Sequence, residues 1–265
     1  MNTNTSQFKL YSWNVLHIIH ELNYALDCSF VLDKWLNNEN GRLNQIAKII
    51  VKYASQEKSV ICLQECPGDL LQILNAMNRG EYIINNYQYG RTPKLKNHLA
   101  TNPYVDITEH LVTIVGRNIN VDDTQIVQFD DPGKASLIIN VNVGTQNILI
   151  ANIHCPFGSS RNVAFNKLLV EIGTNRFIIV GDLNSEQWEL ELMFDKTIYK
   201  FSNIKEPTRI AKSIKKTKKG NEIIVRETIL DHLIGSTDVK FLKPFVEKNK
   251  FDLSDHFLIG CNISF

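Results

Sequence analysis

Apolar residues recur along this chain with two different spacings, and each spacing predicts a different kind of element. Helical spacing is plainest over residues 41–53, and further helices are predicted over 67–77, 161–172 and 186–193. Short runs rich in valine, isoleucine and tyrosine predict strands. These runs are 8–13, 59–63, 82–89, 111–115, 125–129, 135–143, 147–153 and 177–180, and three more close the chain between 223 and 265. The Gly144-Thr145 pair predicts a hairpin between two of the strands.

The order of these elements decides the fold class. Some strands follow one another as hairpins and others alternate with helices, which excludes a purely doubly wound parallel sheet. We therefore expect an α/β protein in which two mixed β-sheets pack face to face with helices outside. No linker, repeat or low-complexity tract divides the chain. We expect a polar N-terminal tail over residues 1–7 and a single domain over residues 8–265.

Composition narrows the class of protein. A hydrophobic fraction of 43% in 265 residues is ordinary for a folded protein, and a formal net charge of +1 means that any affinity for polyanions must come from local clusters. The five cysteines are odd in number and lack a C-x-x-C pair, which favours buried thiols in a reducing compartment. Because the N-terminus is polar and no apolar run has the length of a membrane span, we expect an intracellular monomer, cytoplasmic or nuclear, rather than a secreted or membrane protein.

Six short polar motifs interrupt the apolar runs, most of them where a predicted strand ends. They are Ser12-Trp13-Asn14, Leu63-Gln64-Glu65, Asn152-Ile153-His154, Gly181-Asp182-Leu183-Asn184, Leu230-Asp231-His232 and Leu253-Ser254-Asp255-His256. An aspartate and a histidine at the edge of an apolar strand bring a hard oxygen ligand and a titratable ring to one point. Metal-assisted attack on a phosphate needs this combination.

Each motif has a structural explanation when it is taken alone. Asn14 is an ordinary turn or cap residue, and His154 an ordinary histidine at a strand end. A carboxylate such as Glu65 beside a buried strand must be solvated, paired or bound to a metal. The Gly-Asp-x-Asn string that contains Asp182 is also a common loop. The functional interpretation therefore depends on the whole set.

Taken in order, the six motifs resemble those of the endonuclease/exonuclease/phosphatase superfamily. The resemblance covers residues 8–265, and the Gly-Asp-x-Asn and Ser-Asp-His strings carry most of its specificity. It implies a four-layered α/β sandwich and Mg²⁺-dependent hydrolysis of a phosphoester.

The resemblance also implies a metal shell. Carried over to matching positions, it makes Asn14, Glu65 and Asp255 the metal ligands. Their oxygen atoms suit Mg²⁺ or Mn²⁺, which keep several waters and leave room for a phosphate oxygen.

The remaining matching residues are implied to act on the substrate. Asp182 would position or deprotonate the attacking water, and Asn184 would hold that water or a phosphate oxygen. His154 and His256 would bind the phosphoryl oxygens, and Asp231 would fix the tautomer of His256 through a hydrogen bond. His232 matches no family role, and we interpret it as structural.

Departures from individual subfamilies bear on the substrate. Leu16 stands where exonuclease III-like abasic-site enzymes carry an acid, and 226–231 lacks the string typical of inositol 5-phosphatases. The first motif, followed by Trp35 and Arg42, is most similar to nocturnin-like RNA 3′ exonucleases. We therefore expect a nuclease or phosphodiesterase on nucleic acid, RNA or single strands rather than duplex. The alternatives are a phosphomonoesterase on inositol or other small or lipid phosphates, and a catalytically silent binding relative.

Basic residues supply candidate contacts to a nucleic acid. A run of them precedes the strand that carries Asp231, and it is either a solvated loop or an arch over the site that holds a polyanion. This run contains Arg209, Lys212, Lys215, Lys216, Lys218 and Lys219. Arg161, at the start of a predicted helix, is a further candidate phosphate contact.

Overall fold

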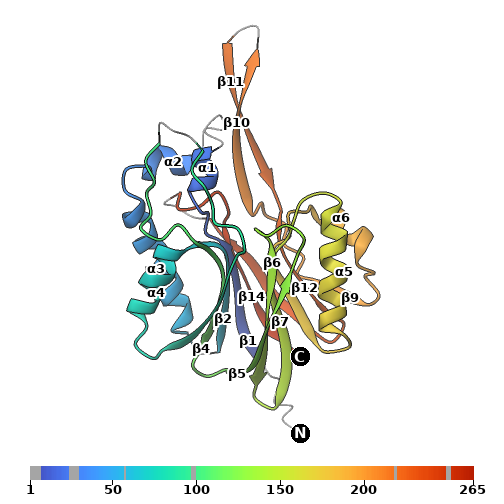
Figure 1. Cartoon of the computed structure of the whole chain (residues 1–265). Coiled ribbons are helices and arrows are strands. Elements are labelled where there is room, and N and C mark those ends of the chain that lie inside the picture. Colours follow the sequence, from blue (N-terminus) through green and yellow to red (C-terminus); the bar gives the residue numbers. More distant parts are fainter. Residues whose placement is uncertain (1–6, 24–29, 57, 97–99, 218–219, 249–251) are drawn as a thin grey trace.

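A computed structural model of the protein describes residues 7–23, 30–56, 58–96, 100–217, 220–248 and 252–265. Its strands form two six-stranded mixed sheets and a separate two-stranded hairpin (Figure 1). The first sheet has the order β13 (Lys240–Glu247), β14 (Leu258–Ser264), β1 (Gln7–Asn14), β2 (Ser59–Pro67), β4 (Glu109–Gly116), β3 (Tyr82–Gln88). The second has the order β5 (Asn120–Gln128), β6 (Ala135–Val143), β7 (Gln146–His154), β8 (Phe177–Asp182), β12 (Asp231–Ser236), β9 (Tyr199–Phe201).

Helices cover the outer faces of both sheets, which gives the expected four-layered α/β sandwich. The first sheet is covered by α3 (Glu39–Ala54) and α4 (Gly68–Met77), and the second by α5 (Ser160–Ile172) and α6 (Gln187–Met193). Two shorter helices, α1 (Ile19–Asn23) and α2 (Phe30–Trp35), lie between β1 and α3 in the chain. No helix in these described ranges is long and apolar enough to cross a membrane.

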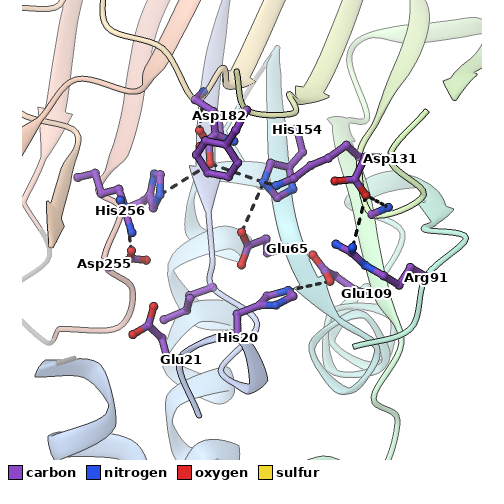
Figure 2. A pocket seen from close by; sticks show the side chains of 16 residues that line it. His20, Glu21, Glu65, Arg91, Glu109, Asp131, His154, Asp182, Asp255 and His256 are labelled. Atoms are coloured by element: carbon purple, nitrogen blue, oxygen red, sulfur yellow. Dashed lines mark hydrogen bonds and ion pairs between the residues drawn. The ribbon is translucent and has the colours of Figure 1, made fainter. Parts of the chain in front are cut away.

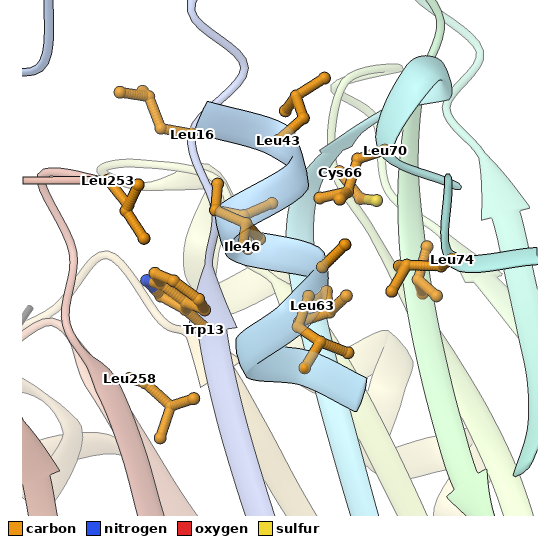
Figure 3. Packing of buried hydrophobic residues seen from close by; sticks show 14 of the residues in the cluster. Trp13, Leu16, Leu43, Ile46, Leu63, Cys66, Leu70, Leu74, Leu253 and Leu258 are labelled. Atoms are coloured by element: carbon orange, nitrogen blue, oxygen red, sulfur yellow. The ribbon is translucent and has the colours of Figure 1, made fainter. Parts of the chain in front are cut away.

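Alternate residues of the inner strands fill separate cores. On β2, Val60 and Cys62 face the second sheet, whereas Ile61 and Leu63 pack under the helices, because successive side chains point to opposite faces of a strand. Figure 3 shows Leu63 beside Ile46 of α3 in the outer core. A strand buried on both faces reads as one continuous apolar run, which is why 59–63 predicted a strand without alternation.

A buried polar bridge joins the two sheets close to one edge. Asn152 of β7 donates to the backbone oxygens of Leu63 and Val112, and its own oxygen accepts a 2.7 Å hydrogen bond from Gln64 Nε2. Gln64 also bonds to Ser12. These side chains are 0–1% exposed, so their hydrogen bonds offset the cost of burying polar groups. Ser12, Gln64 and Asn152 thus fix the position of one sheet relative to the other. Each of these residues belongs to one of the six polar motifs.

The topology brings the motifs to that edge. The strands β1 and β2 run parallel, as do β7 and β8, so their carboxyl ends lie on the same side. In the second sheet His154 pairs with Asp182, and the antiparallel β12 begins with Asp231 directly opposite Asp182.

The basic run differs from the predicted loop. Residues 209–217 form β10, which pairs along its length with β11 (Gly220–Thr228), and the hairpin extends away from the sheets (Figure 1). β-branched residues lie on both sides of Gly220, at 210 and 214 before it and at 223–225 after it, and they suit a two-stranded ribbon better than an irregular loop. The segment after residue 223 therefore holds four strands, not the three expected.

Four cysteines, Cys62, Cys66, Cys155 and Cys261, are buried free thiols, as the sequence predicted. Cys28 lies outside the described residues.

Candidate active site

Asp182 contacts several side chains at this edge, and Figure 2 marks its contacts with His154 and His256. Its Oδ2 accepts a 3.0 Å hydrogen bond from Asn14 Nδ2, and its Oδ1 accepts one of 3.0 Å from the backbone N–H of Asn184. Asn14 Nδ2 also donates to Glu65 Oε1 at 3.1 Å. One amide group from β1 therefore holds a carboxylate from each sheet in a fixed position.

Unusual backbone conformations aim these side chains into the pocket. Glu65 has a φ of 52° at a bulge where the pairing of β2 with β4 shifts register between Leu63 and Cys66. Gly181 has a φ of 143°, and a Cβ there would lie 2.1 Å from the backbone oxygen of Ile153. Only glycine fits, so the glycine of the Gly-Asp-x-Asn motif permits the close approach of β7 to β8.

Two histidines flank Asp182. The Nε2 of His154 lies 3.7 Å from Asp182 Oδ2 and 3.5 Å from Glu65 Oε1, and the Nε2 of His256 lies 3.8 Å from Asp182 Oδ2. The other ring nitrogen of each histidine is also engaged: Nδ1 of His154 with the Tyr89 hydroxyl at 3.2 Å, and Nδ1 of His256 with Asp231 Oδ2 at 2.8 Å.

The two rings differ in charge. Burial and then the charge of Lys134 lower the pKa of His154 to about 3. Burial also opposes charge on His256, but Asp231, Asp182 and Asp255 outweigh it and raise its pKa to about 10. At neutral pH His256 is therefore a buried cation, and His154 is neutral with Nε2 against Lys134 Nζ. A cation at His256 can stabilise negative charge that develops on a phosphoryl group.

Asp255 is held by the base of the hairpin. Its Oδ2 accepts a 2.9 Å hydrogen bond from Arg209 Nε, and its backbone oxygen accepts one from the N–H of Ile210. The other oxygen, Oδ1, is buried and has no hydrogen-bond partner among the described residues. Arg209, the first residue of the basic run, is thus part of the site.

The acidic groups suit a divalent metal ion. Glu65 and Asp255 line one pocket, and Asp255 Oδ1 is an oxygen ligand not used elsewhere. Burial alone would raise the pKa of Glu65, but the charges of His20 and Lys134 and the hydrogen bond from Asn14 keep it below its usual range, so the group is ionised. Among the described residues, Glu65, His154 and Asp182 have ligand atoms close enough together to hold an ion, whereas Asp255 belongs to no such group, so its role as a ligand stays a prediction.

Asn14 has its amide nitrogen, not its oxygen, toward Glu65 and Asp182. The oxygen accepts a 3.1 Å hydrogen bond from the N–H of Leu16. In this orientation Asn14 positions the carboxylates, and its role as an oxygen ligand stays a prediction.

Several pocket residues were not found from the sequence. They are His20, Glu21, Arg91, Glu109, Asp131, Lys134 and Phe157. Most come from loops or strand starts, where the apolar pattern carries no signal. The Asp-Pro-Gly-Lys turn before β6, which places Lys134 against His154, was the one local hint. His20 bonds to Glu109 at 3.0 Å, and that bond raises the pKa of His20 to about 9 despite the opposing effect of burial.

Some predicted substrate contacts lie elsewhere. Arg161 donates to both carboxylate oxygens of Glu189 and to the backbone oxygen of Asn184, so it supports the loop after β8 and does not line the pocket. His232 bonds to the backbone oxygens of Ser185 and Ile229, in keeping with a structural role. Lys215 and Lys216 lie on β10, where the structure describes only the backbone, and Lys218 and Lys219 lie outside the described residues. Their substrate contacts stay predictions.

A four-layered sandwich with carboxylates and histidines gathered at one edge defines a class of metal-dependent phosphoric ester hydrolases. The model of the Endonuclease/Exonuclease/phosphatase family matches residues 11–256, and the chain belongs to this family. No curated protein matches the chain by sequence at a significant level.

Three solved structures are similar over almost their whole length. ANGEL2, a 2′,3′-cyclic phosphatase in complex with adenosine-2′,3′-vanadate, has a TM-score of 0.70 and 14% identity over 99% of this chain and 97% of its own. TDP2 from D. rerio, complexed with a single-strand DNA product, has a TM-score of 0.68 and 16% identity over 98% of this chain and 100% of its own. An endonuclease/exonuclease/phosphatase family protein from Bacteroides thetaiotaomicron has a TM-score of 0.67 and 14% sequence identity, and the match covers 99% of this chain and 99% of its own. At these identities the likeness shows the fold.

Proposed function

We propose that the protein is a Mg²⁺-dependent phosphodiesterase that hydrolyses nucleic acid, with a preference for RNA or single strands. The observation that carries the proposal is Asp182, oriented by two hydrogen bonds and flanked by His154 and His256 at 3.7 and 3.8 Å. A carboxylate fixed between two imidazoles in a pocket lined by further acids suits the activation of water beside a phosphate.

Glu65 and Asp255 are the residues that would hold the ion, with Asn14 beside them. When bound there, Mg²⁺ or Mn²⁺ acts as a Lewis acid on a phosphate oxygen and stabilises the leaving group. The two carboxylates come from different segments of the chain, Glu65 from β2 and Asp255 from the segment before β14, and both line the pocket.

The protein's own groups divide the remaining work. Asp182 orients the attacking water, since both of its oxygens are fixed by N–H donors, and it takes the proton of that water. His256, charged and held by Asp231, stabilises the negative charge on the phosphoryl oxygens. Lys134, against His154, adds a second positive charge to the same pocket, and Asn184 is held by its bond to the Cys155 backbone oxygen.

The rim of the pocket favours a nucleotide over a small phosphate. The pocket has a volume of about 330 Å³, within the range of sites that bind small molecules. Phe157 is on this rim with 67% of its surface exposed, and Lys134 Nζ lies 5.6 Å from the centre of its ring. An exposed aromatic ring beside a cation suits a stacked base next to its phosphate. The adenosine-2′,3′-vanadate bound to ANGEL2 and the single-strand DNA product bound to TDP2 also support this proposal.

The test is hydrolysis of labelled single-stranded RNA, single-stranded DNA, duplex DNA and inositol phosphates, each in EDTA, Mg²⁺ and Mn²⁺. We expect cleavage of single strands with metal and none in EDTA. Release of phosphate from inositol phosphates alone would identify a phosphomonoesterase, and no hydrolysis of any substrate would identify a silent relative.

A matched pair of variants tests the base-stacking role. Phe157→Ala should raise KM for the oligonucleotide and leave bis(p-nitrophenyl) phosphate unaffected. Trp188→Ala removes an equally exposed aromatic side chain on α6, outside the pocket lining, and should change neither.

The four buried free thiols support an intracellular location, because cysteines stay reduced in a reducing compartment. We propose that residues 8–265 form one catalytic domain and act as a monomer.

A further inference from the structure

A second pocket adjoins the candidate active site on the side away from Asp255 and His256. Its volume is about 310 Å³, and it shares His20 and Arg91 with the first pocket (Figure 2). It lies between the end of α1 and the loop 91–96 that follows β3. We call it the basic pocket.

The basic pocket has the opposite charge to the site beside it. Arg91, Lys94 and Lys96 line it, and no aspartate or glutamate does so in the part of the chain that the structure describes. Six acidic residues line the active-site pocket. Within the same described ranges, no carboxylate lies within ion-pair distance of Lys94 or Lys96, and Arg91 is 3.6 Å from Asp131. The two lysines are exposed cations available to an anion.

The loop that carries these lysines is fixed in place. Asn23, the last residue of α1, donates from Nδ2 to the backbone oxygen of Lys94 at 2.8 Å and accepts from the N–H of Lys96 at 2.6 Å. One side-chain amide thus pairs with the loop as a neighbouring strand would. Pro93, directly before Lys94, is buried and restricts the backbone further. A fixed loop presents its charges with less loss of conformational entropy on binding.

We infer that the basic pocket binds the phosphate next to the scissile one on a nucleic-acid strand. The inference rests on the proposed function. A strand whose scissile phosphate lies at Glu65 and Asp182 must place its next phosphate close by, and the acidic residues of the site repel that charge. The basic pocket is contiguous with the site and neutralises the charge with Arg91, Lys94 and Lys96.

The test replaces single phosphates by neutral methylphosphonates. Each fluorescent pentanucleotide of a series carries one methylphosphonate, at a different position of the strand. Binding is measured in EDTA for the wild type, for Lys94→Gln/Lys96→Gln and for Lys200→Gln/Lys240→Gln. The last pair is a control, because Lys200 and Lys240 are exposed on β9 and β13 at the end of the sheets opposite the site. Anisotropy gives Kd, and a separate assay with Mg²⁺ measures hydrolysis.

At one position of the strand, the methylphosphonate should raise Kd roughly tenfold for the wild type and for the control. The same methylphosphonate should raise Kd less than twofold for Lys94→Gln/Lys96→Gln. The salt dependence of that variant should also flatten by roughly 0.7 per lost contact. Equal penalties in all three proteins at every position, or no measurable binding to the wild type, would overturn the inference. Failure of the proposed function would show separately, as a wild type that binds the strand and does not hydrolyse it with Mg²⁺.

Discussion

Arg42 offers a stringent test of how the fold positions the site. Its guanidinium is completely buried and donates to both carboxylate oxygens of Glu39 at 2.6 Å. It also donates to the backbone oxygens of Val15, Leu16 and Leu253. The first two directly follow Asn14, and the third precedes the Ser-Asp-His motif. Arg42 therefore joins the two segments that carry Asn14 and Asp255, two of the proposed metal ligands.

Replacing Arg42 with methionine keeps most of the volume and removes every one of these bonds. Breaking a buried ion pair by removing one partner costs about 3–5 kcal/mol, because the remaining charge is left buried. Glu39 would keep only the Tyr104 hydroxyl, at 2.7 Å. The three carbonyl groups lose about 1 kcal/mol each. Since the two effects overlap, we expect the free energy of unfolding to fall by about 5 kcal/mol.

Urea denaturation in EDTA measures the loss, and turnover of the folded fraction measures the positioning. Arg42→Lys should lie between wild type and Arg42→Met, since an ammonium group can pair with Glu39 but cannot reach three carbonyls at once. Adding Glu39→Gln to Arg42→Met should recover part of the stability and none of the activity. Arg117→Met, at an exposed position, is the control. A loss below about 1 kcal/mol for Arg42→Met would refute this reasoning.

Three further predictions concern the metal and the charged histidine. Glu65→Gln should weaken Mn²⁺ binding in calorimetry without unfolding the protein, whereas Glu171→Gln on α5 should leave it unchanged; full activity of Glu65→Gln in trace metal would refute its role as a ligand. His256→Ala and Asp231→Ala should each lower turnover by orders of magnitude, and the double variant by far less than their product. Because the folded pKa of His256, about 10, is above its ordinary 6.5, its stabilisation is complete below pH 6.5 and disappears as pH rises through 10. The stability difference between wild type and Asp231→Asn in EDTA should therefore shrink from pH 6 to pH 10, and a constant difference would contradict the assignment.

The sequence predicted those parts of the fold that follow from local periodicity. Strands such as 135–143 and the helix over 161–172 agree with β6 and α5 to within a residue, since apolar spacing reports directly which face is buried. The motifs at strand ends also predicted which residues meet, because parallel strands end at a common edge. The hairpin β10–β11 was missed, since its few β-branched residues are outnumbered by a run of lysines.

Details that depend on contacts between distant segments were not predictable in this way. The bulge that turns Glu65 into the pocket is a property of the pairing of β2 with β4. The Arg91 and Lys134 side chains reach the site from loops whose path is set by packing. Ser12, Gln64 and Asn152 lie inside the functional motifs, yet the structure uses them to join the sheets.

The central claim is that a metal-dependent hydrolysis of nucleic-acid phosphodiesters depends on Asp182. The most direct measurement is the initial rate of cleavage of a labelled single-stranded RNA, with Mg²⁺ and with EDTA, by the wild type and by Asp182→Asn of matched stability. The account predicts cleavage by the wild type only with Mg²⁺, and a rate for Asp182→Asn lower by a factor of roughly 10³ or more, the scale of losing a positioned general base. Cleavage that continues in EDTA, or that Asp182→Asn performs at the wild-type rate, would contradict it.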